Sequence, residues 1–240
     1  APSSSGTKNL SRGVDRARIL LGCLQPGQAA SLYSDALNRL ADRLHYLNAS
    51  GDKTQDTTQF WFDTRANLRR EMEDRKGRFD DKNEVRGRIA EIVSTLSGGR
   101  GLFDGVHIFT PHSDVPDDSQ LRLVVLDLDR SYSKLDPRPA TDAVKDYVSN
   151  NGTKPRFKGN RLVFLAPDGG SLGRLRDVVR AALAWNSIVD DIGSGRLNID
   201  KLQEKQALKE QKTANDVAAR AARECFRWVL CPVMNTPTDV

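Results

Sequence analysis

The sequence lacks long apolar runs and has few cysteines. No hydrophobic stretch approaches the roughly 20 residues that span a bilayer, and the N-terminal stretch APSSSGTKNLSRG has no apolar segment of the kind that a secretory signal needs. Cys23, Cys225 and Cys231 are odd in number and stand in apolar sequence, which predicts buried thiols rather than a disulfide framework. These features favour a cytoplasmic protein with no membrane partner.

Motifs of nucleotide and zinc sites are also missing. No phosphate loop, in which GxxxxGK precedes Ser or Thr, occurs in the sequence. Cys225 and Cys231 do not form a CxxC pair, and His107 and His112 lack zinc-ligand spacing with partners elsewhere. We therefore expect no cofactor in this chain, and the sequence assigns it no catalytic residue.

The charge is mildly basic and unevenly distributed. The net charge is +5, and residues 1–79 carry 13 Lys and Arg against 9 Asp and Glu, whereas the remaining residues carry 24 against 23. A basic first third permits contact with nucleic acid. A solvated face of mixed charge explains the same numbers and is the favoured interpretation.

Residues 1–79 are expected to form a winged-helix-like module. Apolar residues recur at helical spacing in residues 14–24 and 30–44, with Pro26 and Gly27 between them. The runs LHYLNAS and TTQFWFD then predict two strands around a polar turn, with Trp61 and either Phe60 or Phe62 as the packing anchor. A third helix follows from Ala66 to about Arg78. Two helices followed by a β-hairpin are the order of a winged helix, with one more helix expected upstream.

Winged-helix modules often place a helix in the DNA major groove. The candidate phosphate-binding residues are Arg39, Arg43, Lys53, Arg65, Arg69 and Arg70. However, Asp35 and Asp42 share the face of the second helix and repel phosphates, and the spacing predicts that Arg69 pairs with Glu73 and Arg70 with Asp74. DNA binding and purely structural packing both stay open, and packing is favoured.

Residues 80–196 predict a small α/β sheet layer with covering helices. An amphipathic helix, EVRGRIAEIVSTLSG, precedes three apolar runs, GVHIFT, LRLVVLDLD and RLVFLAP. Two further helical patterns follow the second and third runs, which is typical of a sheet covered by helices, and the second and third strands are expected to be parallel. The fold class is therefore α+β with an α/β part.

Residues 197–240 predict a long C-terminal helix and a tail. The helix is polar up to Asp216 and apolar afterwards, with Val217, Ala221, Cys225, Trp228 and Val229 on one face and Pro232 as its stop. Such a face folds back onto this domain or packs on a partner.

Two stretches are candidates for chemistry. Asp127 and Asp129 follow the second predicted strand, where carboxylates often bind metal ions in nucleases, although carboxylates at a strand end are more often only solvated. Pro167–Ser171 joins a strand to a helix, where backbone N–H groups bind anions, but an ordinary turn is favoured.

Three segments together resemble a known family. RGVDRARILLGCLQPGQ, YSDALNRLADRLHYL and QFWFDTRANLRREMEDR are similar to the domain-of-unknown-function family 499 region of large bacterial AAA-type ATPases, which are associated with anti-phage defence. NRLVFLAPDGGSLGRLRDVVRAALAWNSIVDD and ARECFRWVLCPV resemble its C-terminal half.

The resemblance implies that the chain is a non-catalytic regulatory or interaction region of a P-loop ATPase. The parent protein would carry its nucleotide loop upstream and would bind ATP and Mg²⁺. The implied partners are the remainder of that ATPase, with duplex DNA and other defence-system proteins as further candidates. A DNA-binding module and a metal-dependent nuclease at Asp127 and Asp129 are the alternative functions.

Overall fold

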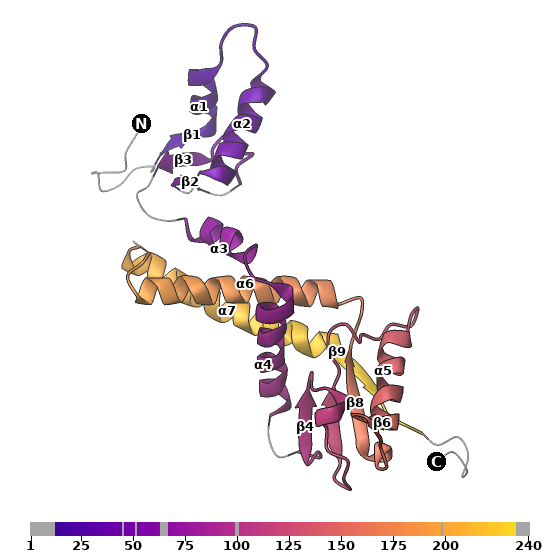
Figure 1. The fold of residues 1–240 in the computed structure, drawn as a ribbon. Helices are drawn as coiled ribbons and strands as arrows, with labels where there is room; N and C mark the ends of the chain where they lie inside the picture. The colour runs from indigo at the N-terminus through magenta and orange to yellow at the C-terminus, as the bar shows by residue number, and fades with distance from the viewer. Residues whose placement is uncertain are drawn as a thin grey trace. The chain divides into compact units, whose positions relative to one another are not determined.

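The computed structural model describes residues 13–44, 46–50, 52–62, 67–98, 101–197 and 199–233. The chain divides into two compact units, which are Ala1–Gly77 with Ala184–Glu210, and Arg78–Leu183 with Gln211–Val240. Helices and small sheets alternate along the chain (Figure 1). The protein is therefore of mixed α+β class with a long helix near its C-terminus, as the sequence predicts.

The N-terminal module contains two helices and a three-stranded antiparallel sheet of order β1-β3-β2. Its elements are β1 (Val14–Asp15), α1 (Arg16–Cys23), α2 (Ala30–Arg43), β2 (Leu47–Ala49) and β3 (Gln59–Phe62). The predicted hairpin is confirmed. Strand β1 was not predicted, because two residues are too few to show an alternating pattern. Gly13 precedes it at a φ of 101°, where an added Cβ would lie 2.4 Å from the Phe60 carbonyl oxygen.

A buried arginine fixes the two helices to the hairpin of this module. The guanidinium of Arg16 donates a hydrogen bond to Asn38 Oδ1 at 2.9 Å and further bonds to Ser34 Oγ and the Lys53 carbonyl. The apolar core around it is small, and its buried members are Leu37, Ala41, Leu47 and Phe60. Phe60 is therefore the packing anchor of β3.

The predicted apolar face of α2 is only partly buried. Leu37 is buried, whereas Leu32 is 69% exposed and Leu40 48% exposed. The periodic pattern identified the helix, but this small module does not cover the whole face. The leucines remain as exposed apolar surface.

Helix α3 (Leu68–Lys76) is confirmed within one or two residues of its predicted start and end. Asn67 caps it by accepting from Arg70 N–H at 3.3 Å. Arg75 forms ion pairs with Glu71 at 2.8 Å and with Asp191 at 2.7 Å, and it donates to Ser187 Oγ at 2.7 Å. Contacts between α3 and α6 thus hold these parts of the first unit together. The spacing of charged residues along α3 predicts only pairs within that helix and not these contacts.

The second unit is built on a four-stranded sheet of order β4-β5-β8-β9. Strands β4, β5 and β8 are parallel, which confirms the predicted parallel pair, and β9 runs antiparallel to β8. The elements are η1 (Asp81–Val85), α4 (Arg86–Ser97), β4 (Gly105–Ile108), η2 (His112–Asp114), β5 (Arg122–Val125), α5 (Arg138–Ser149), β6 (Asn150–Asn151), β7 (Lys154–Pro155), η3 (Gly159–Arg161), β8 (Leu162–Pro167), α6 (Leu172–Gly193), α7 (Lys201–Cys225) and β9 (Phe226–Leu230).

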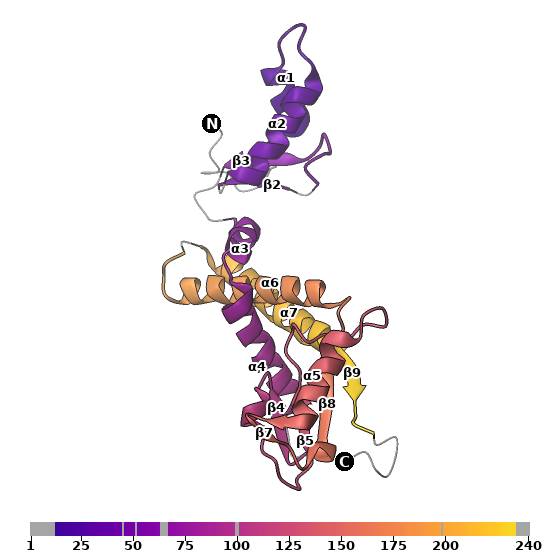
Figure 2. The same ribbon diagram turned by 45° about the vertical axis from the view of Figure 1, so that its right-hand side comes forward.

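Helices cover both faces of this sheet (Figure 2). Val125 belongs to a core with residues of α4, α6 and α7, whereas its neighbour Val124 belongs to a core with Ala140 and Ala143 of α5. Because successive strand residues point to opposite faces, two separate cores form. This matches the near-continuous apolar strands of the sequence.

The prediction that the C-terminal helix continues to Pro232 is wrong. Helix α7 ends at Cys225, and the next five residues form β9 at the edge of the sheet. Phe226, Trp228 and Val229 are aromatic or β-branched, which favours a strand, and β8 offers an unpaired edge. The apolar end of the chain therefore folds back onto its own domain.

The three cysteines differ in environment. Cys225 is buried, and burial raises its pKa to about 11, whereas Cys23 and Cys231 are exposed. The prediction of buried thiols is thus correct for Cys225 alone. Within the described ranges, every helix is too short or too polar to cross a membrane.

Candidate functional site

The carboxyl ends of the parallel strands bring Asp127 close to Arg86. Arg86 Nη2 donates to Asp127 Oδ2 at 2.6 Å, and Arg86 Nε lies 2.9 and 3.0 Å from the two carboxylate oxygens. This hydrogen bonding raises the pKa of the Arg86 guanidinium. Asp129 is exposed. A cation at Asp127 would have to displace Arg86, so the two carboxylates do not form an open metal site.

Phe109 lies beside this ion pair in a strained backbone conformation. Its φ is 52°, in the left-handed region that bulky residues rarely adopt. The Arg86 guanidinium lies 5.1 Å from the centre of the Phe109 ring, and the Phe226 ring lies 6.1 Å away on centroids. Its N–H donates to the Val125 carbonyl at 3.0 Å. These contacts hold Phe109 in place and tie β4 to β5 at the position of Asp127.

The loop after β5 is hydrogen-bonded through the backbone of Tyr132 to the carboxyl end of β8. Ligands of open α/β sheets bind at the carboxyl ends of adjacent strands whose connections leave toward opposite faces. Helices α5 and α6, which follow β5 and β8, pack in different cores. Here Tyr132 N–H donates to the Pro167 carbonyl at 2.8 Å, and the Tyr132 carbonyl accepts from Gly169 N–H at 3.0 Å. The loop after β5 therefore closes the position where a ligand would otherwise bind.

The Pro167–Ser171 turn is held by the carboxylate of Asp168. Asp168 accepts from Ser171 Oγ at 2.7 Å and from Trp228 Nε1 at 2.9 Å. These two hydrogen bonds, that from Ser171 first, lower the pKa of Asp168. A fixed negative charge at the start of α6 interacts favourably with the helix dipole and repels a second anion. The segment is a strand-to-helix turn, as favoured from the sequence.

The prediction that no serine of the sequence stands in a GxSxG context is wrong, because this turn contains one. Residues 169–173 read GGSLG, the GxSxG pattern of a hydrolase nucleophile elbow, and they stand between a strand and a helix. In such an elbow the serine is held in a strained conformation. Among the described residues other than glycine, only Phe109 has a positive φ, and Ser171 Oγ donates to Asp168 rather than to a histidine. The motif is present, but the nucleophile geometry is not.

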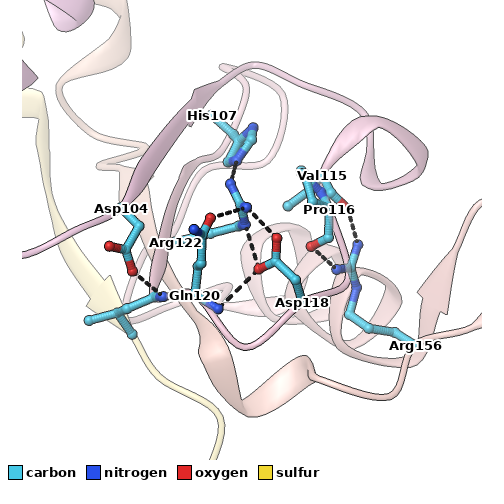
Figure 3. A network of polar contacts seen from close by, with 9 residues as sticks. Asp104, His107, Val115, Pro116, Asp118, Gln120, Arg122 and Arg156 are labelled. Carbon is cyan, nitrogen blue, oxygen red and sulfur yellow. Dashed lines mark hydrogen bonds and ion pairs between the residues drawn. The ribbon is translucent and has the colours of Figure 1, made fainter.

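Two buried arginines, Arg122 and Arg156, organise the loop between β4 and β5 in the α/β unit (Figure 3). Arg122 donates to Asp118 Oδ2 at 2.5 Å and to Gln120 Oε1 at 2.7 Å, and its Nη1 lies 3.3 Å from His107 Nε2. The hydrogen bond from Arg122 lowers the pKa of Asp118, and burial together with Arg122 lowers the pKa of His107. His107 thus belongs to a structural network rather than to a zinc site.

The second of these arginines, Arg156, binds backbone carbonyls. It donates to the carbonyls of His112, Val115 and Pro116 at 2.9, 2.9 and 3.0 Å. Burial lowers the pKa of Arg156. Both arginines fix the long loop between β4 and β5. Neither role is predictable from the sequence, since the partners of these arginines are not periodic along the chain.

The candidate DNA-binding residues are only partly brought together. Lys53, Arg69 and Arg70 line one hollow of about 830 Å³ in the first unit, which Asp52, Glu73 and Asp74 also line. Arg39 is exposed on α2 and does not line it. Arg65 and the side chain of Arg43 lie outside the described residues. Three cations and three carboxylates give the hollow no net positive charge.

The expected ion pairs of α3 are partly present. Arg70 Nε lies 3.9 Å from Asp74 Oδ2. Arg69 is exposed, and in the part of the chain that the structure describes it forms no ion pair with Glu73. Arg69 is therefore available to an external anion, while Arg70 is mostly buried.

Comparisons with known proteins add no relative. No protein-family model matches the chain, and no curated protein or solved structure matches it. The resemblance to the ATPase region therefore stays a prediction.

Proposed function

We propose that this chain is a non-catalytic regulatory and interaction region of a P-loop ATPase that acts in a bacterial anti-phage or DNA-processing system. The observation that carries the proposal is the N-terminal order of strand, two helices and hairpin with a β1-β3-β2 sheet. We interpret this arrangement as a winged-helix-like module that joins the ATPase to the α/β unit. ATP and Mg²⁺ would bind elsewhere in the parent protein.

The α/β unit supports an interaction role through its own contacts. Asp127 is bound by Arg86, the backbone of Tyr132 is hydrogen-bonded to the end of β8, and Asp168 holds a turn. Asp127 and Asp168 at the carboxyl end of the sheet thus each have a structural partner. A metal-dependent nuclease at Asp127 and Asp129 gains no support from this arrangement.

Substitution of the exposed leucines of α2 tests whether the chain associates with the parent ATPase. Reading the gene upstream for a phosphate loop identifies the parent ATPase. The isolated chain is then mixed with a form of the parent ATPase from which the segment that corresponds to this chain has been deleted. Association of the two and ATP hydrolysis are measured. We expect Leu32→Ala with Leu40→Ala to weaken association, because both side chains are exposed apolar surface. Leu135→Ala, at a residue that is 100% exposed in the other unit, is the matched control.

Two results would overturn the proposal. One is ATP hydrolysis by the isolated chain that persists through a repeated purification. The other is equal association by the α2 double variant, the control and the unchanged chain, with unchanged folding by circular dichroism.

Duplex DNA binding by the N-terminal module is the second candidate. It is favoured by the position of Lys53 and Arg69 on one hollow and by the exposure of Arg69. If these cations contact phosphates, Lys53→Gln with Arg69→Gln weakens binding and reduces its salt dependence. An absence of binding even at about 50 mM salt would end this candidate.

A further inference from the structure

The segment from residue 152 to 161, which reads GTKPRFKGNR, is basic and carries an exposed aromatic side chain. It contains β7 and η3, and we name it the Phe157 loop. Phe157 is 83% exposed. No Asp or Glu occurs between Asp146 and Asp168, whereas the loop contains four cations, Lys154, Arg156, Lys158 and Arg161. The loop therefore combines positive charge with an aromatic ring that is open to solvent.

The backbone of the Phe157 loop is fixed although the ring is exposed. The N–H groups of Phe157 and of the next residue each donate at 2.8 Å to one oxygen of the Asp117 carboxylate. The side chain of Arg156 is buried and donates to three carbonyls of the loop between β4 and β5 (Figure 3). At Gly159 an added Cβ would lie 2.8 Å from the carbonyl oxygen of Val148, so the loop lies directly against α5. The ring of Phe157 is thus presented to solvent by an anchored turn.

Three cations of the loop are available to an anion. Lys154, Lys158 and Arg161 are exposed, and in the part of the chain that the structure describes none of them forms an ion pair. Each stands at most four residues from Phe157, which limits the separation of the Cα atoms to about 14 Å. Asp117 brings a carboxylate to the loop, but the cations outnumber it. The loop therefore presents an excess of positive charge around the ring.

We propose that the Phe157 loop binds single-stranded nucleic acid. Sites of this kind combine an aromatic ring, which stacks on an unpaired base, with Lys and Arg side chains that bind the phosphates. The bases of a duplex are already stacked on one another, so the ring favours a single strand. A turn whose backbone is already anchored loses little conformational entropy on binding. The geometry thus supplies stacking, charge and preorganisation together.

An acidic protein is the alternative partner of these cations. Lysine is depleted in the cores of protein–protein interfaces, which makes a protein the poorer fit to the two lysines beside the ring. DNA and RNA strands offer the same bases and phosphates to the loop, and a 2′-hydroxyl contact is what distinguishes them. The proposal uses no residue of the N-terminal module and does not depend on the ATPase assignment.

The test uses the full chain with two variants and a matched control for each. Phe157→Ala removes the ring, and Leu135→Ala, its control, removes a fully exposed apolar side chain from another loop. The charge variant combines Lys154→Gln, Lys158→Gln and Arg161→Gln. Its control makes the same change of charge at exposed lysines elsewhere in the second unit, with Lys82→Gln, Lys134→Gln and Lys212→Gln.

Fluorescence anisotropy measures the binding of labelled oligonucleotides between roughly 50 and 200 mM salt. The ligands are a thymidine strand, a uridine strand and a duplex of the same length. Circular dichroism and the melting temperature verify that each variant is folded. The strand that binds more tightly identifies the ligand as DNA or RNA, and either result supports the proposal.

The two variants should differ in their effect. Phe157→Ala should weaken binding of a single strand roughly 5- to 150-fold, the contribution of one stacked base, and should leave the salt dependence unchanged. The charge variant should lower the slope of log K against log salt by up to about 2.1, at about 0.7 for each phosphate contact of a single strand. Both controls should bind like the unchanged chain.

Four outcomes would overturn the proposal. They are no binding of either strand at about 50 mM salt, equal losses in a variant and its control, tighter binding of the duplex than of both single strands, and displacement by poly-glutamate as effective as by an unlabelled strand. The last of these assigns the loop to an acidic protein. Failure of the ATPase association experiment leaves this test unaffected, so the two proposals fail separately.

Discussion

Arg86 and Asp127 are 41 residues apart in sequence, yet they form a bidentate ion pair at the carboxyl end of the sheet. The guanidinium side chain is 39% exposed and the carboxylate side chain 27% exposed. Solvent therefore screens part of their attraction. The bidentate geometry, and not the charge alone, determines how much the pair contributes to the free energy of unfolding. The pair holds α4 against β5.

Removal of this carboxylate should destabilise the α/β unit moderately. For Asp127→Asn we expect a loss of about 1 kcal/mol in the free energy of unfolding, because a charge-assisted bidentate contact becomes a weaker neutral one. Urea unfolding measures it. Asp142→Asn, which removes an exposed ion pair with Lys145, is the control and should change little. Equal effects of the two variants would show that the bidentate contact adds nothing.

Asp168 should give the unit a specific acid dependence. Its folded-state pKa is lowered by Ser171 and Trp228 from an ordinary value of 3.8. The stabilisation is therefore complete above the unfolded-state pKa and is lost as the pH falls through the lowered folded-state pKa. We expect Asp168→Asn to be less stable than the unchanged protein at neutral pH. The difference should shrink once the pH falls below about 3.8.

Melting temperatures of the two proteins across this pH range provide the measurement. A constant difference at every pH would mean that the charge of Asp168 does not contribute. The matched comparison is Ser171→Ala, which keeps the carboxylate but removes its first hydrogen-bond donor and should reduce the acid dependence only in part.

Strand β9 shows how a periodic apolar pattern can predict the wrong secondary structure. Val217, Ala221, Cys225, Trp228 and Val229 recur at helical spacing, so the sequence predicts one helix through all of them. The structure breaks that helix at Cys225 because β8 has an edge to pair and Trp228 can donate to Asp168. Both partners lie about 60 residues upstream, so no local pattern contains them.

A shortened chain tests the role of β9. A chain ending at Cys225 should lose cooperative unfolding of the α/β unit and aggregate, because the edge of β8 becomes unpaired and Phe226 leaves the core. A chain ending at Val233 retains β9 and is the control. Urea unfolding and size-exclusion chromatography provide the readout, and identical behaviour of the two chains would contradict the prediction.

At the scale of the whole molecule, the N-terminal module and the α/β unit have apolar cores of very different size. The N-terminal module buries four apolar residues in one cluster, whereas the α/β unit has two larger clusters. Small cores stabilise weakly. The amides of α1 and α2 should therefore exchange with deuterium faster than those of β5 and β8. Hydrogen-exchange mass spectrometry measures this, and equal protection would contradict it.

Much of this architecture is predictable from patterns along the chain. The hairpin, the parallel strands of the α/β unit and the helices that cover them follow from apolar periodicity and turn residues. The contacts that decide the candidate sites do not. Arg86 with Asp127 and Arg122 with His107 join residues that lie far apart in sequence, and only the folded sheet brings them together. The GxSxG pattern is visible in the sequence, but its backbone conformation is not.

The position of β9 also has a consequence for protein synthesis. Its partner β8 ends at Pro167, and β9 begins at Phe226, with α6 and α7 between them. A ribosome therefore makes three parallel strands and two long helices before it makes the strand that closes the sheet. Pairing across such a separation is slow because a long loop must be ordered first. The α/β unit thus completes its fold only after Leu230 has left the exit tunnel, and until then β8 needs protection from other nascent chains.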